Sequence, residues 1–424
     1  MERNDLKIKT FGCRLNIWES EMIQKFATKA GVKNTLIINS CAVTSNAEKD
    51  ILKYIKKEKK NHSKRNIILT GCSAQINSDL WKKIDEIDFI VGNTNKLNLK
   101  TWKNLKENNL NKINVDDIEN YRSINQNKLN KFRQHTRSFL QIQQGCDHRC
   151  TFCIIPFARG PNRSLSIENI VNSINQLVAN GTKEIILTGV DIASWGIDLF
   201  NKPSLGRLVQ SILAEVPELP RLRLSSIDPA ILDYDLMNAF QNEPRLMPHI
   251  HLSMQHGNDI ILKRMKRRHL SKDIINFCEE ARRKRNNIVF GADIISGFPT
   301  ETIDAHNDTK KLLDYLDISF LHVFPFSIRN GTPSAKMPQI NQRTIKERAT
   351  DLRNFGKYKK NGYFNRRIGT LDMMLLEKNG KGYLSGFEKA KLKDGCNDDY
   401  AFGSLLPVKI TDQKNEVLTV EKLK

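Results

Sequence analysis

The sequence predicts an α/β protein of three parts: an N-terminal parallel-sheet domain, a central partial (β/α)6 barrel and a small C-terminal β-barrel. Two stretches alternate short apolar strands with helical patterns, which is typical of parallel sheets. After them come short strands separated by polar turns, as in small antiparallel barrels. The predicted ranges are 1–103 for the first domain, 104–133 for an Asn- and Lys-rich linker, 134–366 for the central barrel and 367–424 for the last.

The first hundred residues contain four predicted strands, at 7–10, 35–38, 66–70 and 88–91. A cysteine follows each of the first three strands: Cys13, Cys41 and Cys72. Because the carboxyl ends of parallel strands share one edge of a sheet, these three thiols are expected to meet there. The alternative is three free cysteines buried as small core residues. The same position after three successive strands favours a set of metal-cluster ligands.

The central part contains six predicted strands with helices between them, which favours a partial barrel with a site at the strand carboxyl ends. These strands lie at 138–142, 184–187, 221–224, 249–254, 288–295 and 319–323. The C-terminal strands are expected at 371–376, 382–384, 390–392, 406–410 and 416–420, after a helical, basic stretch at 342–367.

The loop after the first strand of the central part carries Cys146, Cys150 and Cys153. A C-x3-C-x2-C spacing groups three soft thiolates on a short length of chain, and such ligands suit an iron–sulfur cluster. Three thiols leave one iron of a four-iron cluster free to bind a substrate. Disulfides, a zinc knuckle and chance spacing are the alternatives, and zinc fits poorly because no fourth cysteine lies nearby.

Composition limits the cellular location and the class of binding partner. No apolar stretch approaches the length needed to span a bilayer, and the first residues lack the apolar core of a secretory signal, so a cytoplasmic protein is expected. Eight cysteines in such a chain are better explained as metal or redox ligands than as disulfides. The formal net charge of +21 favours nucleic acid as partner, before an anionic membrane or a bias in composition.

Several motifs together give a specific resemblance. The three-cysteine loop, with Phe152 before its last cysteine, resembles the signature of radical S-adenosylmethionine (SAM) enzymes. With Cys13, Cys41 and Cys72 and the terminal β-barrel, the chain resembles the radical SAM methylthiotransferase family over nearly its whole length. Arg14-Leu15-Asn16 and the run 158–161 (Ala-Arg-Gly-Pro) resemble its MtaB-type branch, which modifies threonylcarbamoyladenosine in tRNA.

The resemblance implies two [4Fe–4S] clusters, one on each cysteine set, and SAM bound at the open iron of the 146–153 loop. It implies that a SAM-derived radical activates C2 of the adenine at position 37, next to the anticodon. A methylthio group carried on the second cluster is then transferred. No acid–base catalytic residue is expected beyond the clusters. SAM contacts are expected from Phe152 and from three residues that follow strands: Gly189, Ser226 and Gln255. The implied partners are tRNA, an electron donor such as flavodoxin or ferredoxin, and a sulfur donor; the barrel at 367–424 would be an RNA-binding TRAM domain.

Other activities remain open at this point: methylthiolation of isopentenyladenosine in tRNA, methylthiolation of a ribosomal-protein aspartate, or a non-catalytic RNA-binding redox sensor. The basic run 263–269 is expected either to contact tRNA phosphates or to form a solvated helix face. His251 and His256 are expected to be satisfied polar residues, and Cys278 and Cys396 to be incidental.

Overall fold

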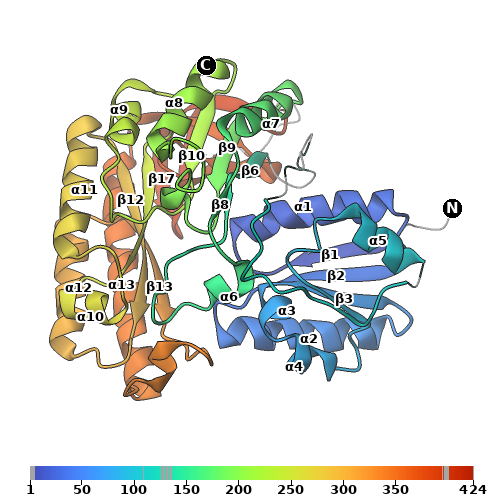
Figure 1. Cartoon of the computed structure of the whole chain (residues 1–424). Helices are drawn as coiled ribbons and strands as arrows, with labels where there is room; N and C mark the ends of the chain where they lie inside the picture. Colours follow the sequence, from blue (N-terminus) through green and yellow to red (C-terminus); the bar gives the residue numbers. More distant parts are fainter. Residues whose placement is uncertain are drawn as a thin grey trace.

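The computed structural model describes residues 5–107, 109–124, 126, 129, 132, 136–393, 395 and 401–423, and Ser45 without its side chain. An N-terminal sheet, a central open barrel and a closed C-terminal barrel follow one another along the chain, as the sequence predicts (Figure 1). None of the helices among these residues is long and apolar enough to cross a membrane. Cys396 and parts of the predicted linker lie outside the described residues.

The N-terminal part is a parallel five-stranded sheet in the order β1-β2-β3-β4-β5. Its strands are β1 (Leu6–Thr10), β2 (Thr35–Ser40), β3 (Asn66–Gly71), β4 (Phe89–Val91) and β5 (Ile113–Asn114). Its helices are α1 (Arg14–Lys29), α2 (Ser45–Asn61), α3 (Cys72–Ile76), α4 (Ser78–Lys82) and α5 (Leu99–Lys106). Helices α1 and α5 cover one face of the sheet and α2 to α4 the other (Figure 1). The predicted linker thus begins inside α5 and supplies the edge strand β5.

The central part is an open barrel made of two parallel sheets, β10-β9-β6 and β11-β12-β13. Two isolated bridges, Leu222 to Leu246 and Ile227 to Leu252, join them into one six-stranded wall. The strands are β6 (Arg137–Gln141), β9 (Glu184–Thr188), β10 (Arg221–Leu224), β11 (His249–Gln255), β12 (Val289–Ser296) and β13 (Phe320–Pro325). A small hairpin of β7 (Gln143–Gln144) and β8 (Arg163–Ser164) brackets the cysteine loop.

Helices cover the outside of this wall (Figure 1). They are α7 (Ile167–Ala179), α8 (Leu205–Glu215), α9 (Tyr234–Asn242), α10 (Asp259–Arg264), α11 (Ser271–Lys284) and α12 (Ile303–Tyr315). The short helix α6 (Ile155–Arg159) instead lies between the barrel and the N-terminal sheet, where it contacts α3 (Figure 1). The apolar faces of the covering helices are buried against the strands, as α7 illustrates. The N-cap of α7 is Ser166, whose side chain accepts a hydrogen bond from the Asn169 amide.

The long helix α13 (Gln342–Arg367) leads to a closed five-stranded barrel in the order β14-β15-β16-β18-β17. Its strands are β14 (Leu371–Leu376), β15 (Lys381–Tyr383), β16 (Lys389–Leu392), β17 (Leu405–Lys414) and β18 (Val417–Lys422). Buried and exposed residues alternate along β16 and most of β17, so apolar side chains fill the barrel and lysines point outward.

One hydrophobic core joins the first two parts. Leu15, Trp18 and Met22 of α1 belong to the same buried cluster as Phe139 and Ile186 of the central barrel. Helix α1 therefore packs between the N-terminal sheet and the barrel (Figure 1). This packing fixes the beginning of α1, where Cys13 lies, relative to the open side of the barrel.

Candidate functional site

The three N-terminal cysteines lie at the carboxyl edge of the N-terminal sheet. Cys13 is the N-cap of α1, Cys72 is the first residue of α3, and Cys41 follows β2. All three are free thiols. A Cβ at Gly12, whose φ is +101°, would lie 3.1 Å from the Cys41 sulfur, so the backbone beside Cys13 approaches Cys41 closely. The predicted gathering of three thiols at one edge is what the chain forms.

The thiols also act on one another electrostatically. Burial raises the pKa of Cys41 to about 11, and the charges of Cys72 and Cys13 raise it too. Desolvation also raises the pKa of Cys13, although the Arg159 charge acts in the opposite direction. Cysteines bind metal as thiolates, so the binding of a metal cluster to these three thiols would release their protons.

A buried guanidinium supports the N-terminal set. Arg159 of α6 donates from Nε to the Cys72 sulfur at 3.0 Å. It also pairs with Glu19 of α1, and its Nη2 lies 3.2 Å from Glu19 Oε2. Lys96 binds the same carboxylate at 2.5 Å, and all three side chains are almost fully buried. Burial opposes ionisation of Arg159, but the charges of Cys72 and Glu19 raise its pKa above the usual range, so it stays a cation.

The second set lies on the loop between β7 and α6. The Cys146 amide donates to the Gly160 carbonyl at 3.0 Å, and the Cys153 amide donates to the Cys150 carbonyl at 3.1 Å. Arg267 donates from Nη1 to the Cys150 sulfur at 3.4 Å and pairs with Asp228 at 2.8 Å. Each set thus has one thiol held by a largely buried arginine, Cys72 by Arg159 and Cys150 by Arg267.

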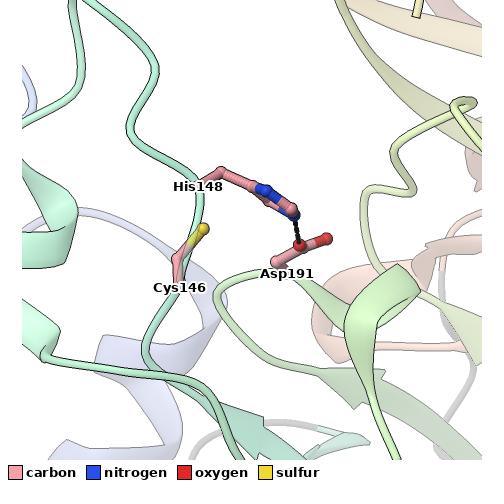
Figure 2. Close-up of side chains that lie close together, drawn as sticks. All are labelled: Cys146, His148 and Asp191. Atoms are coloured by element: carbon pink, nitrogen blue, oxygen red, sulfur yellow. Dashed lines mark ion pairs between the residues drawn. The ribbon is translucent and has the colours of Figure 1, made fainter. Parts of the chain in front are cut away.

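A polar group stands beside Cys146. The side-chain ligand atoms of Cys146, His148 and Asp191 all lie within 4.8 Å of one another. Figure 2 shows the His148–Asp191 ion pair, 3.0 Å long, with the Cys146 sulfur next to it. Burial and the Asp191 charge raise the pKa of Cys146 to about 12. A single metal ion on these three groups is an alternative use of Cys146 that sequence spacing alone does not reveal.

The two cysteine sets face each other. Cys72 packs in one small buried cluster with Ile154, the neighbour of Cys153, and with Ala42 and Ala158. Burial raises the pKa of Cys153 to about 12; the charge of Cys150 raises it too, and that of Cys72 acts in the same direction. Any groups held by the two sets would therefore be neighbours across the contact of α3 with α6.

The donor sets fit the predicted clusters. Each provides three thiols, and Cys278, the other cysteine among the described residues, is buried in the core on α11. A closed structural zinc site requires four ligands, whereas a [4Fe–4S] cluster on three thiols keeps one iron for a further ligand. The four residues predicted to contact SAM remain predictions, and the structure places them as follows.

Phe152 is half-buried against an apolar cluster that includes Met265 and Phe298. Gly189 follows β9, where a Cβ would lie 2.7 Å from the Gln143 side-chain oxygen. Ser226 follows β10 and is half-buried, and Gln255 ends β11 with a φ of +67°. Local packing therefore accounts for Phe152 and Gly189, while Ser226 and Gln255 lie at the carboxyl ends of their strands.

Sequence reasoning missed the side chains that support the cysteines. Arg159, in the run 158–161, and Glu19, in the run 19–21, belong to motifs of the family resemblance but had no predicted role, and Lys96 belongs to no recognised motif. In the run 263–269, Arg267 is 8 % exposed and paired with Asp228, and His269 is fully buried against the same carboxylate. The prediction that this run contacts tRNA phosphates or forms a solvated helix face is therefore wrong for Arg267 and His269. His256 is satisfied by Glu301 and the Asn258 amide, as predicted.

Replacing Gly145 tests how the cysteine loop is built. Its φ is +76°, and a Cβ would lie 1.8 Å from the Pro161 carbonyl oxygen, so Gly145→Ala must displace the residue before Cys146. We expect a stability loss of roughly 1–3 kcal/mol and less iron bound per chain. The control is Gly181→Ala, where φ is +89° but nothing lies within 4 Å. Equal iron content and melting temperature in the two variants would contradict this account.

Comparisons with known proteins agree with this geometry. The radical SAM superfamily model matches residues 140–313, and the model described as uncharacterized protein family UPF0004 matches residues 5–92. The "Threonylcarbamoyladenosine tRNA methylthiotransferase MtaB" of Rickettsia prowazekii is 45% identical over 392 residues, 92% of each chain. That of Thermotoga maritima is 34% identical, covering 92% of this chain and 90% of its own.

More distant relatives extend the picture. The "tRNA-2-methylthio-N(6)-dimethylallyladenosine synthase" of Neorickettsia sennetsu is 29% identical over 97% of this chain and 92% of its own. Among solved structures, the radical SAM methyltransferase TsrM from Kitasatospora setae has a TM-score of 0.53 at 14% identity, covering 75% of this chain and 67% of its own, a likeness of fold alone. The family implies SAM and a [4Fe–4S] cluster. With 45% identity over almost the whole chain, the protein belongs to the MtaB-type branch of the radical SAM methylthiotransferase family.

Proposed function

We propose that this enzyme adds a methylthio group to C2 of N6-threonylcarbamoyladenosine at position 37 of tRNA, next to the anticodon. The observation that carries the proposal is the pair of facing three-cysteine sets, at Cys72 on one side and Ile154 on the other. The names of the relatives at 45% and 34% identity support the choice of substrate.

The cysteine sets divide the work. Cys146, Cys150 and Cys153 would hold the cluster that binds SAM, and Cys13, Cys41 and Cys72 a second [4Fe–4S] cluster. When bound, these groups supply a 5′-deoxyadenosyl radical and the sulfur that is transferred. The protein's part is to place the acceptor carbon between the two sets, one of whose thiols, Cys13, is exposed.

One arginine would support a cysteine sulfur in each of the two sets. Arg267 donates to the Cys150 sulfur and Arg159 to the Cys72 sulfur. When these two cysteines serve as ligands, the contacts hold each sulfur in place and set a positive charge beside it. Phe152, Gly189, Ser226 and Gln255 remain the candidates for SAM contacts.

Charge favours tRNA as the partner. Exposed basic residues lie along α13 and on the outer face of the C-terminal barrel, within a chain of net charge +21. They include Arg343, Lys346, Arg353 and Lys357 on α13, and Lys389, Lys391 and Lys409 on the barrel. Such residues bind phosphates without reading sequence. The barrel at 367–424 is thus proposed as the TRAM-type RNA-binding module. With tRNA as the substrate, the proposed location of the reaction is the cytoplasm.

The reaction also needs an electron donor and a sulfur donor. We propose a flavodoxin or ferredoxin as the electron donor, together with a separate sulfur donor.

Mass spectrometry of tRNA nucleosides tests the substrate. A strain lacking the gene is expected to lose 2-methylthio-N6-threonylcarbamoyladenosine and to accumulate its unthiolated precursor. Complementation with the wild-type gene should restore the product, and the Cys72→Ala gene should not. Loss of a methylthio-isopentenyladenosine instead would select that nucleoside, and loss of a modified aspartate in mass spectra of the ribosomal proteins would select the protein substrate. No change in any modified species would favour the redox sensor.

A further inference from the structure

A cluster of basic side chains lies where the three parts of the chain meet, and one of its members, Arg14, follows Cys13 in the chain. Its centre is Phe387, on the 384–388 loop of the C-terminal barrel, whose φ is +75°. Arg14 of α1 and Arg223 of β10 each stack over this ring at 5.0 Å, and the His249 ring of β11 stacks on it at 5.0 Å. Arg137 of β6 lies 5.6 Å from the same ring.

The other charges in this cluster are paired. Arg221 and Arg223 bind Glu184 at 3.5 and 3.2 Å. Arg137 binds Glu377 at 3.3 Å. Asp293 accepts hydrogen bonds from His251 at 2.9 Å and from His322 at 3.2 Å. Every carboxylate of the group is therefore already used by a neighbour.

Arg14 is different, because its guanidinium has no hydrogen bond or ion pair with any residue that the structure describes, and its recorded contact is the ring of Phe387. His249 is 2 % exposed, and both of its ring nitrogens lack a partner among the same residues. Burial and the charge of Arg223 lower the pKa of His249, with Arg14 acting in the same direction, so the ring is neutral. The Arg14 guanidinium and the His249 ring nitrogens thus both lack a hydrogen-bond partner among these residues, and an anion could bind to both groups.

A metal ion is the competing occupant. The side-chain ligand atoms of His251, Asp293 and His322 lie within 4.8 Å of one another. However, the charges of Arg14 and Arg223 act on the neighbouring His249, and a divalent cation would have only the Asp293 carboxylate among its three ligands to offset their repulsion. The charge of the surroundings thus selects an anion over a cation.

We propose that Arg14 binds the free carboxylate at the end of the threonyl arm of the substrate nucleoside, with His249 as the hydrogen-bonding group beside it. This inference rests on the proposed function, because a threonylcarbamoyl arm ends in a carboxylate and a dimethylallyl arm does not. Arg14 follows Cys13 directly in the chain, so the guanidinium belongs to the residue next to a member of the second cysteine set. The proposal orients the bound adenine with its N6 arm toward this guanidinium.

The arrangement also explains how the substrates are told apart. An apolar arm would leave the Arg14 cation without a counter-charge in a half-buried position, a cost that a carboxylate removes. A backbone phosphate is a second possible source of negative charge, and it would be bound equally in RNAs with and without the arm. The experiment therefore compares such RNAs.

Binding of two anticodon stem–loops, one with N6-threonylcarbamoyladenosine and one with plain adenosine at position 37, is measured by fluorescence anisotropy with the cluster-loaded enzyme. The wild type should prefer the modified RNA, and Arg14→Met should lose about ten-fold affinity for it alone. Lys29→Met, which removes an exposed charge from the other end of α1, should change neither affinity. Arg14→Lys should restore part of the preference.

His249→Phe gives a second test that keeps the ring stack and removes the nitrogens; it should also weaken the modified RNA selectively. The inference is overturned if the wild type shows no preference, if Arg14→Met weakens both RNAs alike, as for a phosphate contact, or if both variants fold and keep the preference. Failure of the proposed function is a separate result: wild-type enzyme that yields no 2-methylthio product from the modified RNA.

Discussion

A Cys150→Ala enzyme is expected to lose SAM cleavage entirely, whereas Cys72→Ala should keep SAM cleavage and lose the methylthio product. Each change removes one of three thiols from a set that has no further cysteine among the described residues. A cluster left with two thiolates is not held, so bound iron should fall from about eight to about four per chain in either variant. The two expected losses differ in kind because the proposed function assigns SAM cleavage to one set and sulfur transfer to the other.

The measurements are iron per chain after anaerobic reconstitution, 5′-deoxyadenosine released, and methylthiolated nucleoside formed. Cys278→Ala is the matched control, because it removes a buried thiol on α11 that contacts neither set. It should leave all three readings near those of the wild type. Persistent 5′-deoxyadenosine formation by Cys150→Ala would contradict the assignment of the SAM-binding set, and loss of it in Cys72→Ala would contradict the division of roles.

The positions of the six cysteines proposed as cluster ligands could be predicted because they depend on short-range rules. Cys13, Cys41 and Cys72 follow strands whose apolar runs are easy to recognise, and parallel topology then brings their ends together. Helix α3 escaped prediction, since it is five residues long and lies among polar residues. Its first residue is Cys72, so a very short element positions one of the proposed ligands.

The supporting shell could not be predicted, because its members are far apart in the chain and only the fold pairs them. Arg159 and Glu19 are 140 residues apart in the sequence, and Lys96 reaches the same carboxylate from a third segment. A basic run such as 263–269 is ordinary surface sequence until Asp228 and Cys150 are found beside Arg267. Buried charge of this kind has no signature in hydrophobic periodicity.

Glu19→Gln is expected to destabilise the protein by about 3–5 kcal/mol, because it leaves Arg159 and Lys96 buried without their carboxylate. The matched control is Glu347→Gln on α13, where the partner Arg343 lies 2.8 Å away but both side chains are mostly exposed. That change should cost less than about 1 kcal/mol. Urea unfolding of both variants measures the difference, and similar midpoints would contradict it.

The same carboxylate predicts how stability depends on pH. Burial opposes ionisation of Glu19, but Arg159 and Lys96 together lower its pKa from 4.5 to about 2. A depressed folded-state pKa stabilises the fold fully above pH 4.5, and this contribution disappears as the pH falls toward 2. Wild-type protein should therefore lose more stability between pH 5 and pH 3 than Glu19→Gln, as measured by urea midpoints at each pH. Parallel curves for the two proteins would show that Glu19 is not held as a carboxylate by Arg159 and Lys96.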